Sequence, residues 1–120
     1  MTTVLLAEDD PEVRKKYAAS LEMSGFKVIM ASDGLEIEAI VPVTPVDIIV
    51  SDTNLESRDG DIACKNLIKQ GKLSGVLIIG MSDDGDADQY WKGIAYDFLY
   101  KGGIDNLGTA VMPRYEKFIS

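Results

Sequence analysis

The chain of 120 residues has no histidine and only one cysteine. Zinc and copper sites are usually built from imidazole and thiolate ligands, so this composition argues against both metals. A single cysteine also excludes an internal disulfide. We interpret Cys64, which falls in a predicted helix, as a small core residue. Any metal site would have to use oxygen ligands, which favours a hard ion such as Mg²⁺.

Positive charge is also scarce. The chain has 12 Lys and Arg residues against 20 Asp and Glu residues, giving a net charge of −8. No basic patch is available to neutralise phosphates, which argues against nucleic-acid binding. The sequence has no apolar run near the ~18 residues of a membrane span and no signal peptide, so we expect a soluble cytoplasmic protein. Its length fits one domain, residues 1–120, without a separate output module.

Short apolar runs alternate with amphipathic stretches five times, which predicts a single doubly wound α/β domain around a parallel sheet. The predicted strands cover residues 3–7, 27–31, 46–51, 76–81 and 98–100. The predicted helices cover residues 11–24, 34–41 and 60–69, a fourth helix from about Asp86 that includes Tyr90, Trp91 and Ile94, and a fifth from about Asp105. Gly108 and Pro113 lie inside the fifth helix, where we expect a kink or a late start.

Acidic residues lie at the ends of two predicted strands. Glu8 and Asp9 follow the first strand, and Asp52 follows the third. Because parallel strands end at the same edge of a sheet, these carboxylates should open into one crevice. Carboxylates ~5 Å apart repel one another by roughly 3 kcal/mol per pair at an effective dielectric of ~20, so the cluster needs a cation. Mg²⁺ takes phosphate oxygens as further ligands, which suggests phosphate chemistry with Asp52 as the nucleophile.

Three motifs occur in a characteristic order. The first strand is followed by two acids, one further residue and proline, at residues 8–11. The third is followed by Asp52 and a loop that closes on Asp-Gly at residues 59–60. Near the end, Phe98 precedes Lys101 by three residues. With these motifs the chain resembles the receiver domains of two-component response regulators over nearly its whole length.

The resemblance implies a flavodoxin-like sheet in the order 2-1-3-4-5 and a phosphoprotein of signal transduction. Such a domain takes a phosphoryl group from a histidine kinase or a phosphotransfer protein onto Asp52. It catalyses its own phosphorylation and dephosphorylation but is not an enzyme with an external substrate. The implied Mg²⁺ ligands are Glu8, Asp9, Asp52 and the backbone carbonyl of Asn54. Asp10 fits better as a helix cap than as a ligand.

The resemblance also implies the switching residues. Lys101 would contact the phosphoryl oxygens, and Phe98 matches an aromatic that changes rotamer. The face formed by the fourth helix, the fifth strand and the fifth helix would bind an output partner or a second copy. Its aromatic residues suit an interface, although core packing explains some of them; they are Tyr90, Trp91, Tyr96 and Tyr100.

The chain departs from the family pattern at several positions. Aligning residues 78–82 with the pattern places the required switch hydroxyl at Ser82, whereas counting back from Lys101 favours Gly80, which has none. We assign Ser82, because Gly80 lies on the same strand face and would leave space beneath it. Gly102 replaces the usual proline, which weakens the turn that positions Lys101. Asp83 adds a charge where the family usually has a small residue.

Three alternatives remain. A pseudo-receiver would keep the acidic site but would be a protein-interaction module with impaired switching. An aspartate-dependent phosphatase would need a second acid two residues after its nucleophile, where this chain has Asn54. A flavodoxin-like electron carrier would need a phosphate-cradling loop rich in glycine or hydroxyls after the first strand.

Overall fold

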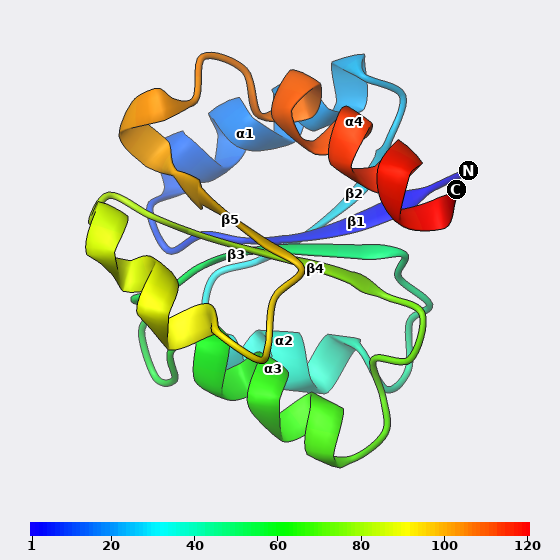
Figure 1. The fold of residues 1–120 in the computed structure, drawn as a ribbon, viewed down its shortest axis with the longest axis vertical. Helices are drawn as coiled ribbons and strands as arrows, with labels where there is room; N and C mark the ends of the chain where they lie inside the picture. Colours follow the sequence, from blue (N-terminus) through cyan, green and yellow to red (C-terminus); the bar gives the residue numbers. More distant parts are fainter.

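The computed structural model describes all residues, 1–120, as one layered α/β domain (Figure 1). A five-stranded parallel sheet has the order β2-β1-β3-β4-β5, which confirms the predicted fold class. The strands are β1 Thr3–Ala7, β2 Lys27–Ala31, β3 Ile48–Asp52, β4 Leu77–Ser82 and β5 Asp97–Tyr100. Three of them differ from the predicted ranges by one or two residues at their ends, where hydrogen-bonding assignments commonly vary.

Helices cover both faces of the sheet (Figure 1). α1 (Pro11–Met23) and α4 (Leu107–Ile119) lie on one face, and α2 (Gly34–Ile40) and α3 (Gly60–Lys69) lie on the other. Successive side chains of a strand point to opposite faces, so each strand serves two cores. Leu6 of β1 belongs to the core under α1 and α4, whereas Leu5 belongs to the core under α2 and α3.

The first helix begins and ends as its sequence predicts. The Asp10 carboxylate accepts hydrogen bonds from the backbone N–H groups of Glu12 and Val13, which caps the helix. Pro11 occupies the first helical position, where its missing N–H costs nothing. Gly25 follows the helix with φ +98°, a left-handed conformation that glycine adopts without strain. Asp10 is therefore engaged in capping, as expected.

The fourth predicted helix is wrong in type and extent. The structure has a 3₁₀-helix, η1, at Gly85–Trp91, and Ile94 lies beyond its end. A 3₁₀-helix rises about 2.0 Å per residue against 1.5 Å for an α-helix, so η1 spans a given length with fewer residues than an α-helix would. The connection to β5 is short, and Gly93 (φ +77°) turns the chain directly after η1.

The last helix starts late, as the sequence suggested. A short 3₁₀-helix, η2 (Lys101–Gly103), follows β5, and α4 begins at Leu107 rather than residue 105. Asn106 caps α4 by accepting a hydrogen bond from the N–H of Thr109. A Cβ atom at Gly108 would overlap the backbone of Ser20, so this glycine allows α4 to pack against α1. No helix is both long enough and apolar enough to cross a membrane.

Candidate functional site

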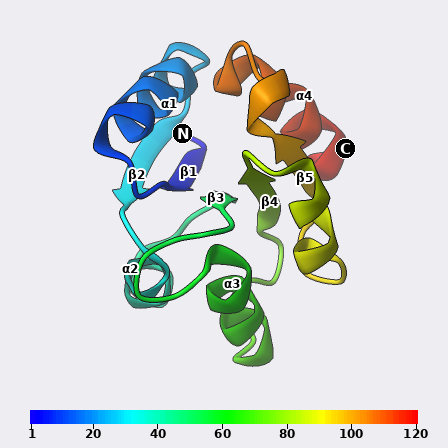
Figure 2. The same cartoon turned by 90° about the vertical axis from the view of Figure 1, so that its left-hand side faces the viewer.

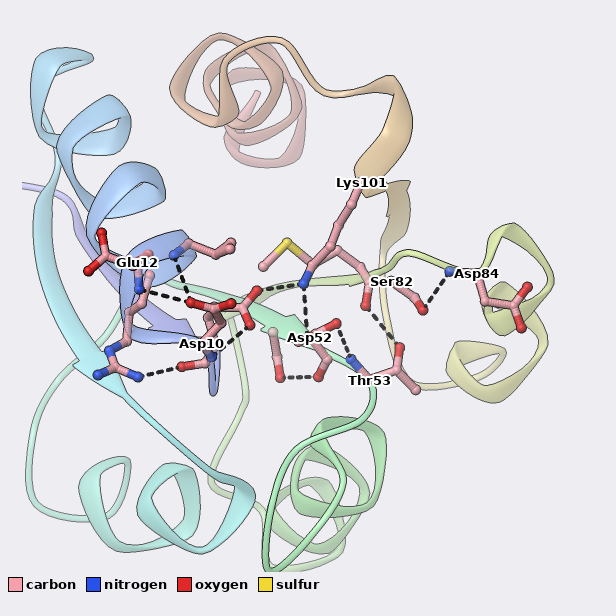
Figure 3. Close-up of polar contacts among 12 residues, drawn as sticks. Asp10, Glu12, Asp52, Thr53, Ser82, Asp84 and Lys101 are labelled. Carbon is pink, nitrogen blue, oxygen red and sulfur yellow. Dashed lines mark hydrogen bonds and ion pairs between the residues drawn. The ribbon is translucent and has the colours of Figure 1, made fainter.

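One lysine joins two acidic residues at the edge of the sheet where β1, β3 and β5 end. Figure 2 shows the strands at this edge, and Figure 3 shows the side chain of Lys101 beside Asp52. The Nζ atom of Lys101 lies 2.5 Å from Oε1 of Glu8 and 3.0 Å from Oδ2 of Asp52. Glu8 is 1% exposed and Asp52 is 8% exposed. The two carboxylates therefore meet at this edge of the sheet, and Lys101 reaches them from just beyond β5 even though Gly102 follows it.

Burial and hydrogen bonding shift the pKa values of Asp52, Glu8 and Lys101 in opposite directions. Burial raises the pKa of Asp52, because a carboxylate away from water loses hydration, and the hydrogen bond from Lys101 opposes that rise only in part. Burial also raises the pKa of Glu8. Burial alone would lower the pKa of Lys101, but its hydrogen bonds to Glu8 and Asp52 prevail and raise it. Lys101 is therefore a permanent cation.

The carboxylates of Glu8, Asp9 and Asp52 lie close enough together that they could bind one metal ion. One oxygen from each lies within 4.8 Å of the others. The ligands are oxygens only, and Asp9 is exposed to solvent, which suits a partly hydrated Mg²⁺ ion. Asn54, whose carbonyl is a predicted ligand, is exposed in the loop after β3.

The loop after Asp52 is held close to the sheet. The N–H of Gly60 donates to the carbonyl of Thr53 at 2.9 Å, and the N–H of Thr53 donates to Oδ1 of Asp52 at 3.1 Å. A Cβ atom at Gly60 would overlap the carbonyl oxygen of Asp52 and the hydroxyl of Ser51. The Asp-Gly motif thus has a structural reason, because only glycine lets the start of α3 approach the end of β3.

Ser82 ends β4 with its hydroxyl turned toward its own loop. The hydroxyl oxygen accepts a hydrogen bond from the N–H of Asp84 at 3.0 Å (Figure 3). Gly80 leaves space on its strand face, as we expected, but the indole of Trp91 fills that space: a Cβ atom at Gly80 would overlap the ring. The role of Ser82 as the switch hydroxyl remains a prediction.

Trp91 and Thr53 form a link that the sequence did not reveal. Trp91 is 2% exposed, and its Nε1–H donates to the hydroxyl of Thr53 at 2.7 Å. That hydroxyl in turn donates to the carbonyl of Met81 at 2.9 Å. The residue directly after Asp52 is therefore tied to β4 and to η1. Gly80 could have indicated this packing of Trp91, because a glycine within a strand often marks the close approach of another group.

The other predicted aromatics differ in exposure. Tyr90, Tyr96 and Tyr100 are each about half exposed, consistent with the expected aromatic surface, whereas Trp91 is a core residue. Phe98 is partly buried and lies beside Gly80 in the register of β4 and β5. Cys64 is fully buried, which raises the pKa of its thiol to about 12 and agrees with a core role.

Comparison with known proteins agrees with these features. A family model described as the response regulator receiver domain matches residues 4–111. The chain is 34% identical over 101 residues to the C4-dicarboxylate transport transcriptional regulatory protein DctD of Pseudomonas aeruginosa, covering 83% of this chain and 22% of that protein. It is 27% identical over 104 residues to the DNA-binding dual master transcriptional regulator RpaA of Synechocystis, covering 84% of this chain and 43% of that protein. The chain thus spans less than half of either relative.

Solved structures share the fold over almost the entire chain. The chemotaxis response regulator CheY4 of Vibrio cholerae has a TM-score of 0.85 at 24% identity, covering 96% of this chain and 98% of that one. The receiver domain of a sensor histidine kinase from Pseudomonas aeruginosa also has a TM-score of 0.85, at 23% identity, covering 98% and 97%. These likenesses confirm the architecture and the strand order.

Proposed function

Because this chain belongs to the response regulator receiver domain family, we propose that it accepts a phosphoryl group from a histidine kinase or phosphotransfer protein on Asp52. The observation that carries the proposal is the convergence of Lys101, Glu8 and Asp52 from three strands. Receiver domains are signalling modules rather than classical enzymes. The proposed reaction is therefore one phosphoryl transfer onto the domain itself, followed by autodephosphorylation.

The chain holds the Asp52 carboxylate by both oxygens. The backbone N–H of Thr53 donates to one oxygen, and Lys101 donates to the other. In the proposed transfer, a carboxylate oxygen forms a bond to phosphorus while the bond from phosphorus to the donor's histidine nitrogen breaks. Lys101 then lies where it can pair with the added negative charge.

Glu8, Asp9, Asp52 and the carbonyl of Asn54 are the residues that would hold Mg²⁺. The close approach of three carboxylates fits a hard cation. A bound Mg²⁺ would neutralise charge on the phosphoryl oxygens. The solved sensor-kinase receiver has a magnesium ion in its active-site cleft, which supports the assignment.

Ser82, Lys101 and Phe98 are the proposed switching residues. Phosphorylation adds about −1.5 to −2 charges, and the hydroxyl of Ser82 would exchange its bond from Asp84 for one to the phosphoryl group. Phe98 would change rotamer with that movement. The surface formed by η1, β5 and α4 would then favour an output partner or a second copy.

The test uses a small-molecule phosphodonor with Mg²⁺, followed by intact mass spectrometry. We expect the wild type to gain the mass of one phosphoryl group, and Asp52→Asn to gain none. Asp47→Asn, a substitution at the opposite end of β3, serves as the matched control and should be phosphorylated like the wild type. A wild type that gains no mass would favour the pseudo-receiver, a binding module with a decayed switch.

We further propose that the domain acts in the cytoplasm, where its kinase would meet it. The curated relatives are transcriptional regulators, and RpaA is described as DNA-binding. The acidic surface of this domain makes direct DNA contact by residues 1–120 unfavourable, since counterion release requires basic groups. Residues 1–120 would therefore act through a contact with protein.

A further inference from the structure

An acidic cavity lies beside Thr53 and Asn54, the two residues that follow Asp52. It has a volume of about 280 Å³ and opens between the loop after β3, the start of α3 and the start of η1. Its lining is polar apart from one alanine and the ring of a tyrosine. The lining residues are Thr53, Asn54, Asp59, Asp61, Asp84, Ala87 and Tyr90.

This cavity has no cation of its own. The four ion pairs of the protein involve none of its lining residues. Asp61 is only 7% exposed, and its Oδ1 has no hydrogen-bond partner. The side chain of Asp59 makes no cap bond, and Asp84 uses one oxygen to accept from the N–H of Asp86. A buried carboxylate oxygen without a hydrogen bond is costly, so the Asp61 side chain would gain from a donor that enters the cavity.

The spacing of the acceptors selects the kind of donor. The three carboxylates of the cavity do not approach one another closely enough to ligate one metal ion; Glu8, Asp9 and Asp52 form the one group of three that does. A guanidinium group presents five N–H donors in a planar fork and can reach acceptors that lie farther apart. The half-exposed ring of Tyr90 at the cavity offers a face on which such a plane can stack.

We propose that this cavity receives the guanidinium group of an arginine side chain presented by a protein partner. Asp61 would accept in the interior while Asp59 and Asp84 accept at the mouth. The site borders Asn54 and Thr53 and so would place a partner beside the proposed phosphorylation site. Binding requires no phosphoryl group on Asp52, and the inference therefore stands apart from the proposed function.

The test follows backbone amide NMR shifts while N-acetyl-arginine amide, a mimic of an arginine within a protein, is added to the unphosphorylated protein. We expect the largest shifts at Asp61, Asp84 and Tyr90. Asp61→Asn, which removes one charge at constant shape, should weaken binding about tenfold. Asp105→Asn, an equal change on an exposed loop, should leave the affinity within about a factor of two, as should Asp52→Asn.

Parallel titrations decide the chemistry of the ligand. N-acetyl-citrulline amide has a similar shape without the charge and should cause no comparable shifts. Equal binding by the lysine analogue, by Mg²⁺ or by citrulline would overturn the guanidinium assignment. Tighter binding of free arginine than of the capped form would instead identify a small-molecule site. Shifts confined to Glu8 and Asp9 that vanish in Asp52→Asn would overturn the cavity as the site.

Discussion

Two acidic clusters adjoin Thr53, and they differ in how their charge is balanced. In the paired cluster, Glu8 and Asp52 share the ammonium of Lys101. In the unpaired cavity, Asp61 and its neighbours Asp59 and Asp84 form no ion pair. Both belong to a chain of net charge −8, so the overall charge does not distinguish them. The difference is one lysine at the end of β5, which pairs with two acids of the first cluster and has no counterpart in the cavity.

Removing the cation of the paired cluster should have the largest effect. Lys101→Met leaves Glu8 and Asp52 buried without a cation, and breaking a buried ion pair costs about 3–5 kcal/mol. Urea unfolding of the metal-free protein should show this loss. Mg²⁺ should recover part of it, because the carboxylates that would hold the ion remain in place.

Lys117→Met, at an exposed position of α4, is the matched control. It should change the free energy of unfolding by less than about 0.5 kcal/mol. Similar losses in both variants would mean that the paired cluster does not depend on its lysine. The contrast with the unpaired cavity would then disappear.

The hydrogen bond from Trp91 to Thr53 can be weakened by a substitution at Gly80. In Gly80→Ala the new methyl group would overlap the indole of Trp91, and overpacking of this kind costs about 1–3 kcal/mol. Trp91 is the only tryptophan, so its emission reports directly on the displaced ring. Weakening of the bond from Trp91 to Thr53 should also widen the unpaired cavity, which Thr53 lines.

Gly103→Ala provides the comparison, because a Cβ atom there would meet only ordinary contact with the ring of Tyr100. It should leave both the stability and the tryptophan emission close to those of the wild type. If the Gly80 and Gly103 variants behaved alike, Trp91 would not be packed on β4 as described.

The paired cluster was predictable because it depends on where strands end. Apolar runs marked the strands, and parallel pairing brought the acids after the first and third strands together. The strand order and the role of Lys101 came instead from the resemblance to receiver domains. The caps at Asp10 and Gly25 had local signals, because each depends on one residue and its immediate place in the chain.

The unpaired cavity and the Trp91 link were not predictable in this way. They depend on how η1 packs against β4 and β5, and the sequence indicated an α-helix there. Asp59, Asp61 and Asp84 each suit a helix end or a solvated loop by themselves. Only this packing of η1 makes them neighbours, and it also buries Trp91 while leaving Tyr90 at the surface.

Replacing the buried carboxylate of Asp61 by a neutral side chain should stabilise the protein modestly. Burial raises the pKa of Asp61, so the folded state binds its proton more tightly than the unfolded state does. Its contribution to stability is greatest at low pH, below the unfolded pKa, and is lost as pH rises through the folded pKa. Asp61→Asn should therefore raise the free energy of unfolding at pH 7 by about 1 kcal/mol, and the gain should shrink in acid.

Denaturation at several pH values checks this expectation, with Asp105→Asn as the exposed control that should show little change. A pH-independent effect of Asp61→Asn would show that the charge of Asp61 is not the source of the gain. A loss of stability would mean that the carboxylate already has a partner within the chain.

The smallest loss of stability is expected at Ser82, whose hydroxyl accepts from the N–H of Asp84, a lining residue of the unpaired cavity. Ser82→Ala removes one hydrogen bond, from the N–H of Asp84, and should cost about 0.5–1.5 kcal/mol. Its effect on signalling should be larger. If Ser82 exchanges this bond for one to a phosphoryl group, the Asp84 wall of the unpaired cavity must respond when the paired cluster is modified. With beryllofluoride as the phosphoryl mimic, the amide of Asp84 should shift in the wild type and in the control Ser20→Ala, but much less in Ser82→Ala. Equal shifts in all three proteins would show that Ser82 does not connect the clusters, and Gly80, which has no hydroxyl, would then mark the switch position.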